Sequence, residues 1–348
     1  MDKTRHHLPR CGAVTNDTLR AMARDTRIDT LKGMLIILVV MGHVITRLDN
    51  VNLINHAVMG LIYIFHMPLF ILISGYVTKH PSQQQPRDMW HGVWNIFVPL
   101  AVFQILLSAR VQIYGGNFFV AMKGFPIGIL WYLLSLICWR AMLYYTPRRL
   151  LHRPWLYLGI ALVASMLCGL THLGTFLSIQ RTLNFYLFFL MGFYYRQGMI
   201  NNAWWHNNRL HIAIVVILLP LIFWLYPRCG NVMNGADYYG LAGLPQKAMI
   251  LTCSIAMSLL VFNLMPDMKC LRPIGRDSLF YYLYHIVFAI NILPAIVYQH
   301  GWPRTFPFVL LYTAIIMAII WLMGKIRFFR WLIHPSLDFL RPKRNANG

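Results

Sequence analysis

Residues 27–43 read RIDTLKGMLIILVVMGH, and this stretch decides the fold because a charged cluster runs directly into an apolar helix that contains a histidine. Ionisable side chains are costly inside a membrane and by default mark functional sites that face a protein-lined cavity. A second histidine, His66, stands in the next apolar segment, IFHMPLFILISGY at residues 64–76. His43 and His66 on consecutive helices predict proton-transfer chemistry within a membrane. The alternative is a pair of neutral histidines that hydrogen-bond between helices.

Composition places most of the chain in lipid. Hydrophobic residues make up 58% and charged residues 12%, whereas a soluble domain carries about 25% charge. All ten acidic residues are Asp, so acid–base work inside the membrane falls to His, Tyr, Cys or an Asp. The net charge of +21 comes from basic loops beside apolar runs, which favours a membrane protein over a nucleic-acid binder. The six cysteines have no metal-ligand spacing, and no metal site is predicted.

Ten apolar runs are long enough to cross about 30 Å of hydrocarbon and predict an all-α, polytopic membrane helix bundle of about ten transmembrane helices. The runs lie at residues 31–48, 57–78, 91–109, 127–146, 155–173, 182–196, 211–227, 247–265, 278–298 and 306–326. With both termini cytosolic, 24 Lys and Arg residues face the cytosol and seven face the outside. The positive-inside rule predicts this orientation. Residues 1–26 are expected to form a poorly ordered basic cytosolic tail, 27–327 the membrane domain, and 328–348 a second basic cytosolic tail.

Helix geometry places both histidines near the middle of the bilayer. His43 follows Lys32 by eleven residues, which is about 16 Å along a helix axis. His66 lies about ten residues into a helix that enters from the opposite side, so it is about 15 Å deep. Two histidines at matched depth, each in a distinctive local sequence, favour a functional role over simple hydrogen bonding between helices.

Four stretches then occur in the order typical of a known family. They are RIDTLKGMLIILVVMGH, FHMPLFILISGY, GILWYLLSLICW at 128–139 and IGRDSLFYYLYH at 274–285. Over about residues 27–327 the chain resembles the acyltransferase-3 membrane family, and within it the fucose-4-O-acetylase-like branch. The resemblance implies an enzyme of the bacterial inner membrane. It would transfer an acyl group, usually acetyl from cytosolic acetyl-CoA, to a hydroxyl of a cell-envelope glycan or exopolysaccharide precursor.

The resemblance assigns roles around the first motif. His43 matches the essential first-helix histidine, and Lys32 matches a basic residue where the family more often has arginine. Lysine keeps the charge but loses the bidentate fork of a guanidinium. Asp29 stands three residues before Lys32 on the same helix face and could pair with it. Lys32 and Asp29 are therefore expected on the acetyl-CoA side, with simple snorkelling of Lys32 as the alternative.

The other motifs supply partners for His43. His66 matches the second-helix position of the family. Pro68, two residues after His66, has no N–H to donate to the Ile64 carbonyl. The missing hydrogen bond would bend the helix and open a cavity around His66. His285 closes the fourth motif, and the resemblance makes it a structural or acceptor-side partner. The pair at 276–277, Arg-Asp, departs from the pattern, because asparagine is common there.

Three further residues are candidates for binding the acceptor. Trp131 opens the fourth span near the outer face, where it could stack on a sugar ring or belong to an interfacial aromatic belt. Arg181 and Asn184 lie three residues apart at the outer start of the sixth span, hence on one face. They could hold hydroxyl or carboxylate groups of the acceptor, and a snorkelling arginine is the alternative.

Two mechanisms and two function classes stay open from the sequence. An unperturbed histidine has a pKa of about 6.5 and suits general-base catalysis, and His43 could instead carry the acyl group as an acyl-imidazole. The rival class is a proton-coupled transporter of a lipid-linked or small sugar substrate, although the two halves of the chain show no repeat. The outer loops are short, so any further delivery step is expected to need polysaccharide-assembly proteins as partners.

The charge asymmetry yields a topology prediction. Reporter fusions after Lys79, Arg149 and Arg209 should report the cytosol, because the basic segments stay inside. Fusions after Gly116 and Gly235 should report the outside. An alkaline phosphatase and fluorescent protein pair measures both states, and a swapped pattern at any two sites would contradict the ten-span arrangement.

Overall fold

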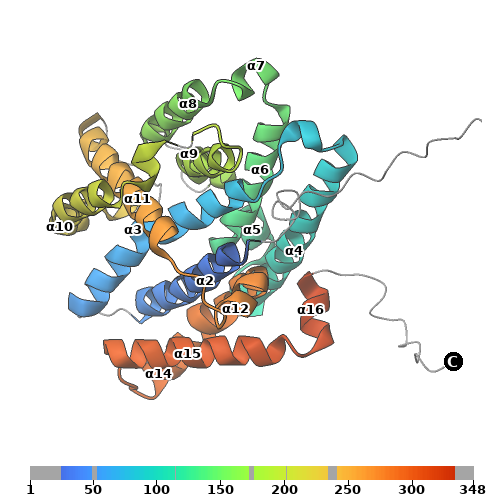
Figure 1. Ribbon diagram of the computed structural model, residues 1–348. Coiled ribbons are helices and arrows are strands. Elements are labelled where there is room, and N and C mark those ends of the chain that lie inside the picture. Colours follow the sequence, from blue (N-terminus) through green and yellow to red (C-terminus); the bar gives the residue numbers. More distant parts are fainter. Residues whose placement is uncertain are drawn as a thin grey trace, which may run out of the picture.

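The computed structural model describes residues 25–48, 53–113, 115–171, 176–200, 202–233 and 241–333. Within these ranges every regular element is a helix (Figure 1), which confirms the all-α prediction. Most of the expected N-terminal tail and residues 334–348 of the expected C-terminal tail lie outside the described residues. The boundaries of both tails therefore stay predictions.

Every predicted span coincides with a helix, and the ninth is built from three consecutive pieces. The long helices are α2 (Thr26–Arg47), α3 (Leu53–Tyr76), α4 (Pro86–Ile113), α6 (Trp131–Tyr145), α8 (Pro154–Leu167), α9 (Ile179–Arg196), α10 (Asn208–Met233), α11 (Leu244–Leu264) and α15 (Phe306–Met323). The ninth span comprises α13 (Ser278–His285), the π-helix η7 (Ile286–Ile292) and α14 (Leu293–Gln299). The short helices are α5 (Phe118–Lys123), α7 (Arg148–Leu151), α12 (Arg272–Arg276) and α16 (Arg327–Ile333). The 3₁₀ turns are η1 (Pro81–Gln83), η2 (Gly128–Leu130), η3 (Cys168–Leu170), η4 (Phe176–Ser178), η5 (Ala203–His206) and η6 (Leu241–Gly243).

Seven segments of the described chain are long and apolar enough to cross a membrane. They are Thr26–Arg47, Leu53–Tyr76, Pro86–Ile113, Phe118–Tyr145, Leu241–Leu264, Ser278–Gln299 and Phe306–Met323, while Pro154–Leu170 and Asn208–Trp224 are shorter apolar helices. The chain is therefore a multi-pass membrane protein. The number of ten spans and the orientation of the termini stay predictions.

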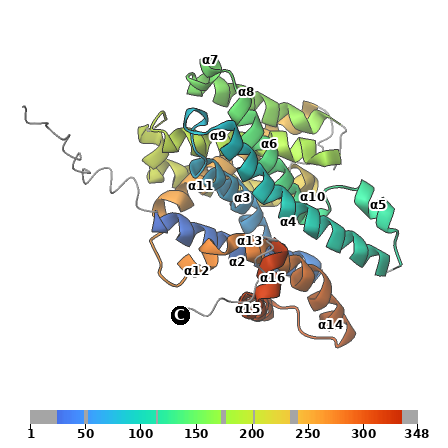
Figure 2. The same ribbon diagram turned by 90° about the vertical axis from the view of Figure 1, so that its right-hand side faces the viewer.

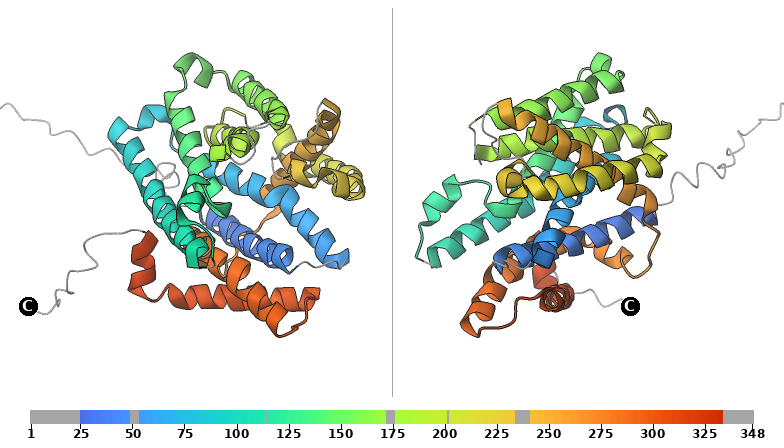
Figure 3. Two further views of the ribbon diagram at one scale, coloured as in Figure 1. Left: turned by 180° about the vertical axis from the view of Figure 1, so that it is seen from behind. Right: turned by 90° about the vertical axis from the view of Figure 1, so that its left-hand side faces the viewer.

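The helices are arranged in a bundle around α2, α3 and α9. In Figure 1, α8 lies above this centre, α10 and α11 to its left, α4 and α6 to its right, and α15 below. The views from behind and from the left-hand side show the same arrangement (Figure 3). Most residues of α9 are buried, and the polar residues Gln180, Thr182 and Asn184 are among them. Polar groups in a membrane protein are stable where the surrounding protein shields them from lipid.

Local signals explain where α2 begins. Asp25 caps the helix by accepting a hydrogen bond from the Arg27 backbone N–H at 3.0 Å, which satisfies one of the unpaired donors of the first turn. Asp267, in the loop before α12, accepts hydrogen bonds from the hydroxyls of Thr26 at 2.6 Å and Thr30 at 2.9 Å. Arg272 and these hydroxyls hold the pKa of the Asp267 carboxyl well below its usual range. The start of α2 is thus tied to α12.

Two glycine pairs allow helices to cross at very short range. A Cβ added to Gly192 of α9 would overlap the Leu72 carbonyl oxygen of α3, and one added to Gly75 of α3 would overlap the Phe189 carbonyl oxygen of α9. Gly33 of α2 and Gly275 of α12 form the same kind of reciprocal contact. Small residues at helix interfaces let backbones approach closely, which is a main source of helix association in membranes.

The π-helix η7 interrupts the ninth span immediately after His285. The Asn291 side chain donates a hydrogen bond to the Ile286 carbonyl at 2.8 Å inside this segment. Pro294 follows within α14 and removes one backbone donor. Short π-helical turns are rare and frequently lie at functional sites. The sequence predicted one regular helix over 278–298, and the structure places a widened turn beside the fourth motif instead.

The α3–α9 crossing gives a stability prediction. Gly192→Ala should lower the thermal stability of the detergent-purified protein, because its Cβ has no room beside the α3 backbone. Overpacking of this kind typically costs about 1–3 kcal/mol. Gly159→Ala on α8 is the matched control, since a Cβ there meets no atom within 4 Å. Equal melting temperatures for the two variants would contradict the close crossing.

Candidate active site

The backbone of α3 fixes the tautomer of His66. This side chain is 6% exposed, and its Nδ1 lies 2.8 Å from the Ile62 carbonyl oxygen one turn earlier. A carbonyl oxygen can only accept, so Nδ1 carries the proton and donates it. The other ring nitrogen, Nε2, therefore holds a lone pair. The Tyr63 ring packs edge-on against the imidazole, with ring centroids 5.1 Å apart.

His43 stands between two other histidines. Its ring centroid lies 5.2 Å from that of His285, and it is within electrostatic reach of both His285 and His66. His285 is fully buried, and its Nδ1 donates to the Tyr281 carbonyl at 3.2 Å. Among the described residues its buried Nε2 has no hydrogen-bond partner. His285 thus packs against His43, and its role as a structural or acceptor-side partner stays a prediction.

His43 and His66 line one cavity of about 260 Å³. Its walls come from α2, α3, η2, α6, α9, α13 and η7. The residues that line it are Val39, His43, Arg47, Tyr63, His66, Met67, Gly128, Ile129, Trp131, Arg181, Phe185, Tyr282 and Ile290. We call it the histidine cavity. Five separate stretches of sequence meet there, which is the arrangement that a binding site between bundled helices requires.

Two of the predicted acceptor residues form one wall of the histidine cavity. The Arg181 guanidinium lies over the Trp131 ring, 5.3 Å from its centroid. Trp131 stacks on Phe185 with a centroid separation of 5.5 Å and an interplanar angle of 27°. An aromatic face of this kind suits the apolar face of a sugar ring, and a cation over it is held by the ring quadrupole.

Asn184 lies away from Arg181 and the histidine cavity. Its Oδ1 accepts hydrogen bonds from Ser165 of α8 at 3.0 Å and from the Lys247 ammonium of α11. Lys247 is only 3% exposed, so the amide oxygen satisfies a buried cation between three helices. The three-residue spacing from Arg181 does not bring Asn184 to the same site, because Arg181 meets Trp131 of α6 whereas Asn184 meets Lys247 of α11.

Asp29 and Lys32 also lie outside the lining of the histidine cavity. Asp29 is 2% exposed and forms an ion pair with Arg276 of α12, Oδ2 to Nε 3.4 Å. Arg276 thus has a structural role at the position where the chain departs from the family pattern. Lys32 is half-buried on α2, eleven residues before His43. About 16 Å of helix separates the two, so Lys32 cannot act on the same atoms as His43.

The sequence interpretation missed three cavity residues, Arg47, Tyr63 and Tyr282. Each lies one helical turn from a histidine: Arg47 is four residues after His43, Tyr63 three before His66, and Tyr282 three before His285. Residues three or four apart share a helix face. A search for polar residues one turn from each histidine would have found all three.

A hydroxyl pair joins α3 and α6 further along both helices. The Ser74 Oγ and the Tyr132 hydroxyl lie 2.7 Å apart, and the Tyr132 ring packs edge-on against Phe70. Ser74 and Phe70 belong to α3, on the same face as His66. The Tyr132 hydroxyl and the Arg140 guanidinium, two turns further along α6, are within electrostatic reach of each other.

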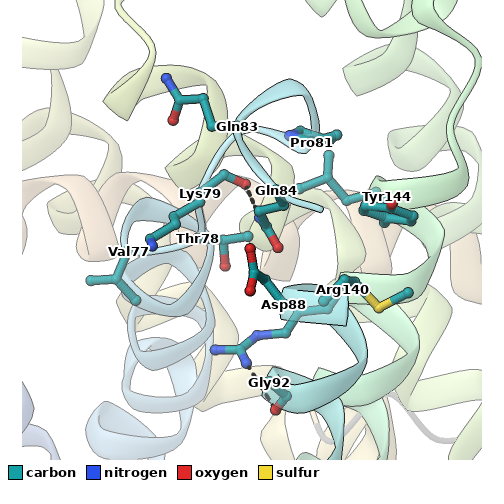
Figure 4. A pocket seen from close by; sticks show the side chains of 12 residues that line it. Val77, Thr78, Lys79, Pro81, Gln83, Gln84, Asp88, Gly92, Arg140 and Tyr144 are labelled. Carbon is teal, nitrogen blue, oxygen red and sulfur yellow. Dashed lines mark hydrogen bonds between the residues drawn. The ribbon is translucent and has the colours of Figure 1, made fainter. Parts of the chain in front are cut away.

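A second cavity of about 250 Å³ is lined by later residues of α3 and α6 (Figure 4). It lies between the end of α3, the start of α4 and the end of α6, and its polar lining includes Thr78, Lys79, Gln84, Asp88 and Arg140. We call it the arginine cavity. The Arg140 Nη1 makes one long hydrogen bond of 3.5 Å to the Gly92 carbonyl, and its Nε is buried without a partner. The guanidinium therefore has donors to spare for a ligand.

Comparison with known proteins identifies the family. Residues 25–325 match the profile of the acyltransferase-3 family, described as an acyltransferase domain. The chain belongs to the acyltransferase-3 family. This acyltransferase is also 46% identical over 59 residues to the nodulation protein NolL of Sinorhizobium fredii (strain NBRC 101917 / NGR234), a match that spans 16% of each chain. No solved structure matches the acyltransferase. The family confirms the resemblance drawn from the four motifs, while the fucose-4-O-acetylase-like branch stays a prediction.

Proposed function

We propose that this membrane acyltransferase moves an acetyl group from cytosolic acetyl-CoA to a hydroxyl of a cell-envelope glycan or exopolysaccharide precursor in the bacterial inner membrane. One observation carries the proposal: His43 and His66 line one cavity whose wall is the Arg181–Trp131–Phe185 stack. The imidazoles supply acid–base or nucleophilic groups, and the stack supplies a surface for a sugar ring.

The chemistry balances in either of two ways. In direct transfer, a histidine takes the proton of the acceptor hydroxyl while the oxygen attacks the thioester carbonyl. The C–S bond then breaks, and the CoA thiolate takes up the proton. In a relay, a ring nitrogen of His43 attacks the thioester carbonyl, the C–S bond breaks, and the CoA thiolate takes the proton from the other ring nitrogen. The acceptor oxygen then attacks the acyl-imidazole carbonyl, the C–N bond breaks, and the hydroxyl proton passes to the imidazole.

His43 is the better candidate for the reacting group. It is partly exposed to the histidine cavity, and the described residues form no hydrogen bond to its ring, so both nitrogens are available. His66 has its tautomer fixed by the Ile62 carbonyl, which leaves a single lone pair for accepting a proton or for orienting its neighbour. His285 packs behind His43 with its Nε2 unpartnered, which suits a positioning residue.

Two features support entry of the donor from the end of the bundle that lies opposite Trp131 and Arg181. The end of α3 and the start of α4 carry basic loops that the charge rule assigns to the cytosol, and the arginine cavity lies between them (Figure 4). Figure 2 shows α12 at one end of the long helices, and α5 and α14 at the other. Acetyl-CoA bound at the arginine cavity, or at Lys32 as the family pattern implies, would send its acyl arm past the Ser74–Tyr132 pair toward His43.

Loss of either histidine should lower the rate of acetyl transfer, and loss of His43 should lower it more. His43→Ala should abolish acetyl transfer, because removing a general base typically costs about a hundred- to ten-thousand-fold in rate. His66→Ala should cost less if His66 only orients its neighbour. The measurement is release of CoA thiol from acetyl-CoA together with labelled acetyl on the acceptor. His91→Ala, at an exposed position of α4, is the control for histidine loss.

The same assay separates the mechanisms and the rival class. A labelled acetyl group trapped on the wild-type protein but not on the His43 variant would favour the relay. A proton-coupled carrier would consume no acetyl-CoA and release no thiol. A folded, membrane-inserted His43→Ala protein that transfers acetyl at nearly the wild-type rate would contradict the proposal.

Lys32 and Arg140 are the two candidate cations for binding a phosphate of acetyl-CoA. If Lys32 binds a CoA phosphate as a point charge, Lys32→Ala should raise the KM for acetyl-CoA more than it lowers kcat, and Lys32→Arg should retain much of the activity. If Arg140 does so, Arg140→Gln should show this pattern instead. Steady-state kinetics with varied acetyl-CoA decides between them, and unchanged donor KM in both variants would contradict a donor site at either cation.

A further inference from the structure

The histidine cavity carries two arginines and no carboxylate. Arg47 and Arg181 line it, and none of its lining residues is acidic. Ion pairs within the described residues include Arg272 with Asp267, Arg276 with Asp29 and Arg330 with Asp277. Neither cavity arginine takes part in one of them. The site therefore has an excess of positive charge that no described side chain of the protein neutralises.

Arg181 is the more informative of the two cations. It is half-buried, its guanidinium rests on the Trp131 ring, and no described hydrogen-bond acceptor meets its N–H groups. Removing a charged group from water without a partner costs free energy. An aromatic face recovers part of that cost. The planar fork of five donors remains available for a carboxylate or a phosphate, which it binds in bidentate fashion.

We infer that the acceptor of this acyltransferase is anionic: a sugar unit bearing a carboxylate or phosphate, with its ring on Trp131 and its anionic group on Arg181. The inference rests on the proposed function and names the substrate class of that site. The cavity of about 260 Å³ is slightly smaller than the range of about 300–1,000 Å³ typical of drug-sized ligands, which fits one sugar unit. Arg47, exposed in the last turn of α2, adds positive potential that attracts such an acceptor.

The location of the arginines favours the acceptor over the phosphates of acetyl-CoA as the source of the anion. Arg47 ends α2, while Trp131 begins α6 and Arg181 lies in the first turn of α9. These helix ends all fall on the outer side in the charge-derived topology. The arginine cavity lies between the opposite ends of α3 and α6. A phosphate of the donor is the competing source, and the experiment separates the two.

Binding is measured first, independently of catalysis. Isothermal titration of the wild-type protein in nanodiscs compares methyl glucuronide, glucose 1-phosphate and the neutral methyl glucoside. At least one anionic probe should bind about ten- to a hundred-fold more tightly than the neutral one, the range expected for hydrogen bonds to a charged group. Added salt should reduce this preference. This measurement needs neither acetyl-CoA nor turnover, so failure of the proposed chemistry would not affect it.

Variants of Arg181 then test whether this side chain causes the tighter binding of anionic probes. Arg181→Gln should reduce the ratio of anionic to neutral binding at least tenfold, and Arg181→Lys should recover part of it. Arg304→Gln is the matched control, because Arg304 also rests on an aromatic ring, that of Tyr298, outside the histidine cavity. In the transfer assay, Arg181→Gln should leave the KM for acetyl-CoA unchanged.

Two results would overturn the inference. They are equal binding of charged and neutral probes by the wild type, and an unchanged ratio of anionic to neutral binding in Arg181→Gln. If the unchanged ratio came with a raised KM for acetyl-CoA, Arg181 would belong to the donor site. Loss of transfer with the charge preference intact would instead contradict the catalytic proposal alone.

Discussion

The reciprocal contact of Gly75 and Gly192 is the constraint on which the site depends. Each glycine leaves room for a backbone carbonyl of the other helix, so α3 and α9 meet at a distance that any Cβ would prevent. α3 carries His66 and α9 carries Arg181, and both side chains line the histidine cavity. The Gly33–Gly275 contact acts in the same way between α2 and α12. It fixes the helix of His43 beside the segment that leads to His285.

Polar groups in this apolar interior are satisfied mainly by the backbone of their own helix. Ser74 donates to the Phe70 carbonyl at 2.8 Å, and Thr78 donates to the Ser74 carbonyl at 2.7 Å. His66 and His285 use the same contact one turn back. This arrangement avoids the cost of unsatisfied groups in a medium without water. In His66 and His285, Nδ1 is held by this backbone hydrogen bond, so only Nε2 is available to react or to bind a neighbour.

The bundle holds two chemically different cavities along α3 and α6. The histidine cavity offers imidazoles, an aromatic stack and unpaired guanidinium groups. The arginine cavity offers Arg140 and amide and hydroxyl groups. Ser74 and Tyr132 bond to each other in the region between them. The proposed transfer from a donor on one side to an acceptor on the other would use one cavity for each substrate.

The sequence by itself determined where the helices lie and which of their residues have matching depth. Apolar runs predicted each helix because the backbone in lipid must satisfy its own hydrogen bonds. Helix rise placed His43 and His66 at matching depth, and they share one cavity with Trp131 and Arg181. Periodicity gives depth and the set of residues on one face. It does not say which neighbour that face meets.

That choice was made by the tertiary structure. Asn184 meets Lys247, Asp29 meets Arg276, and His285 lies behind His43. Their partners come from helices distant in sequence, and their contacts depend on how closely the helices approach. Close approach is set by carbonyl oxygens that fit where a glycine lacks a Cβ. Such a contact depends on the backbones of two helices, so the pattern of one segment does not predict which helices make it.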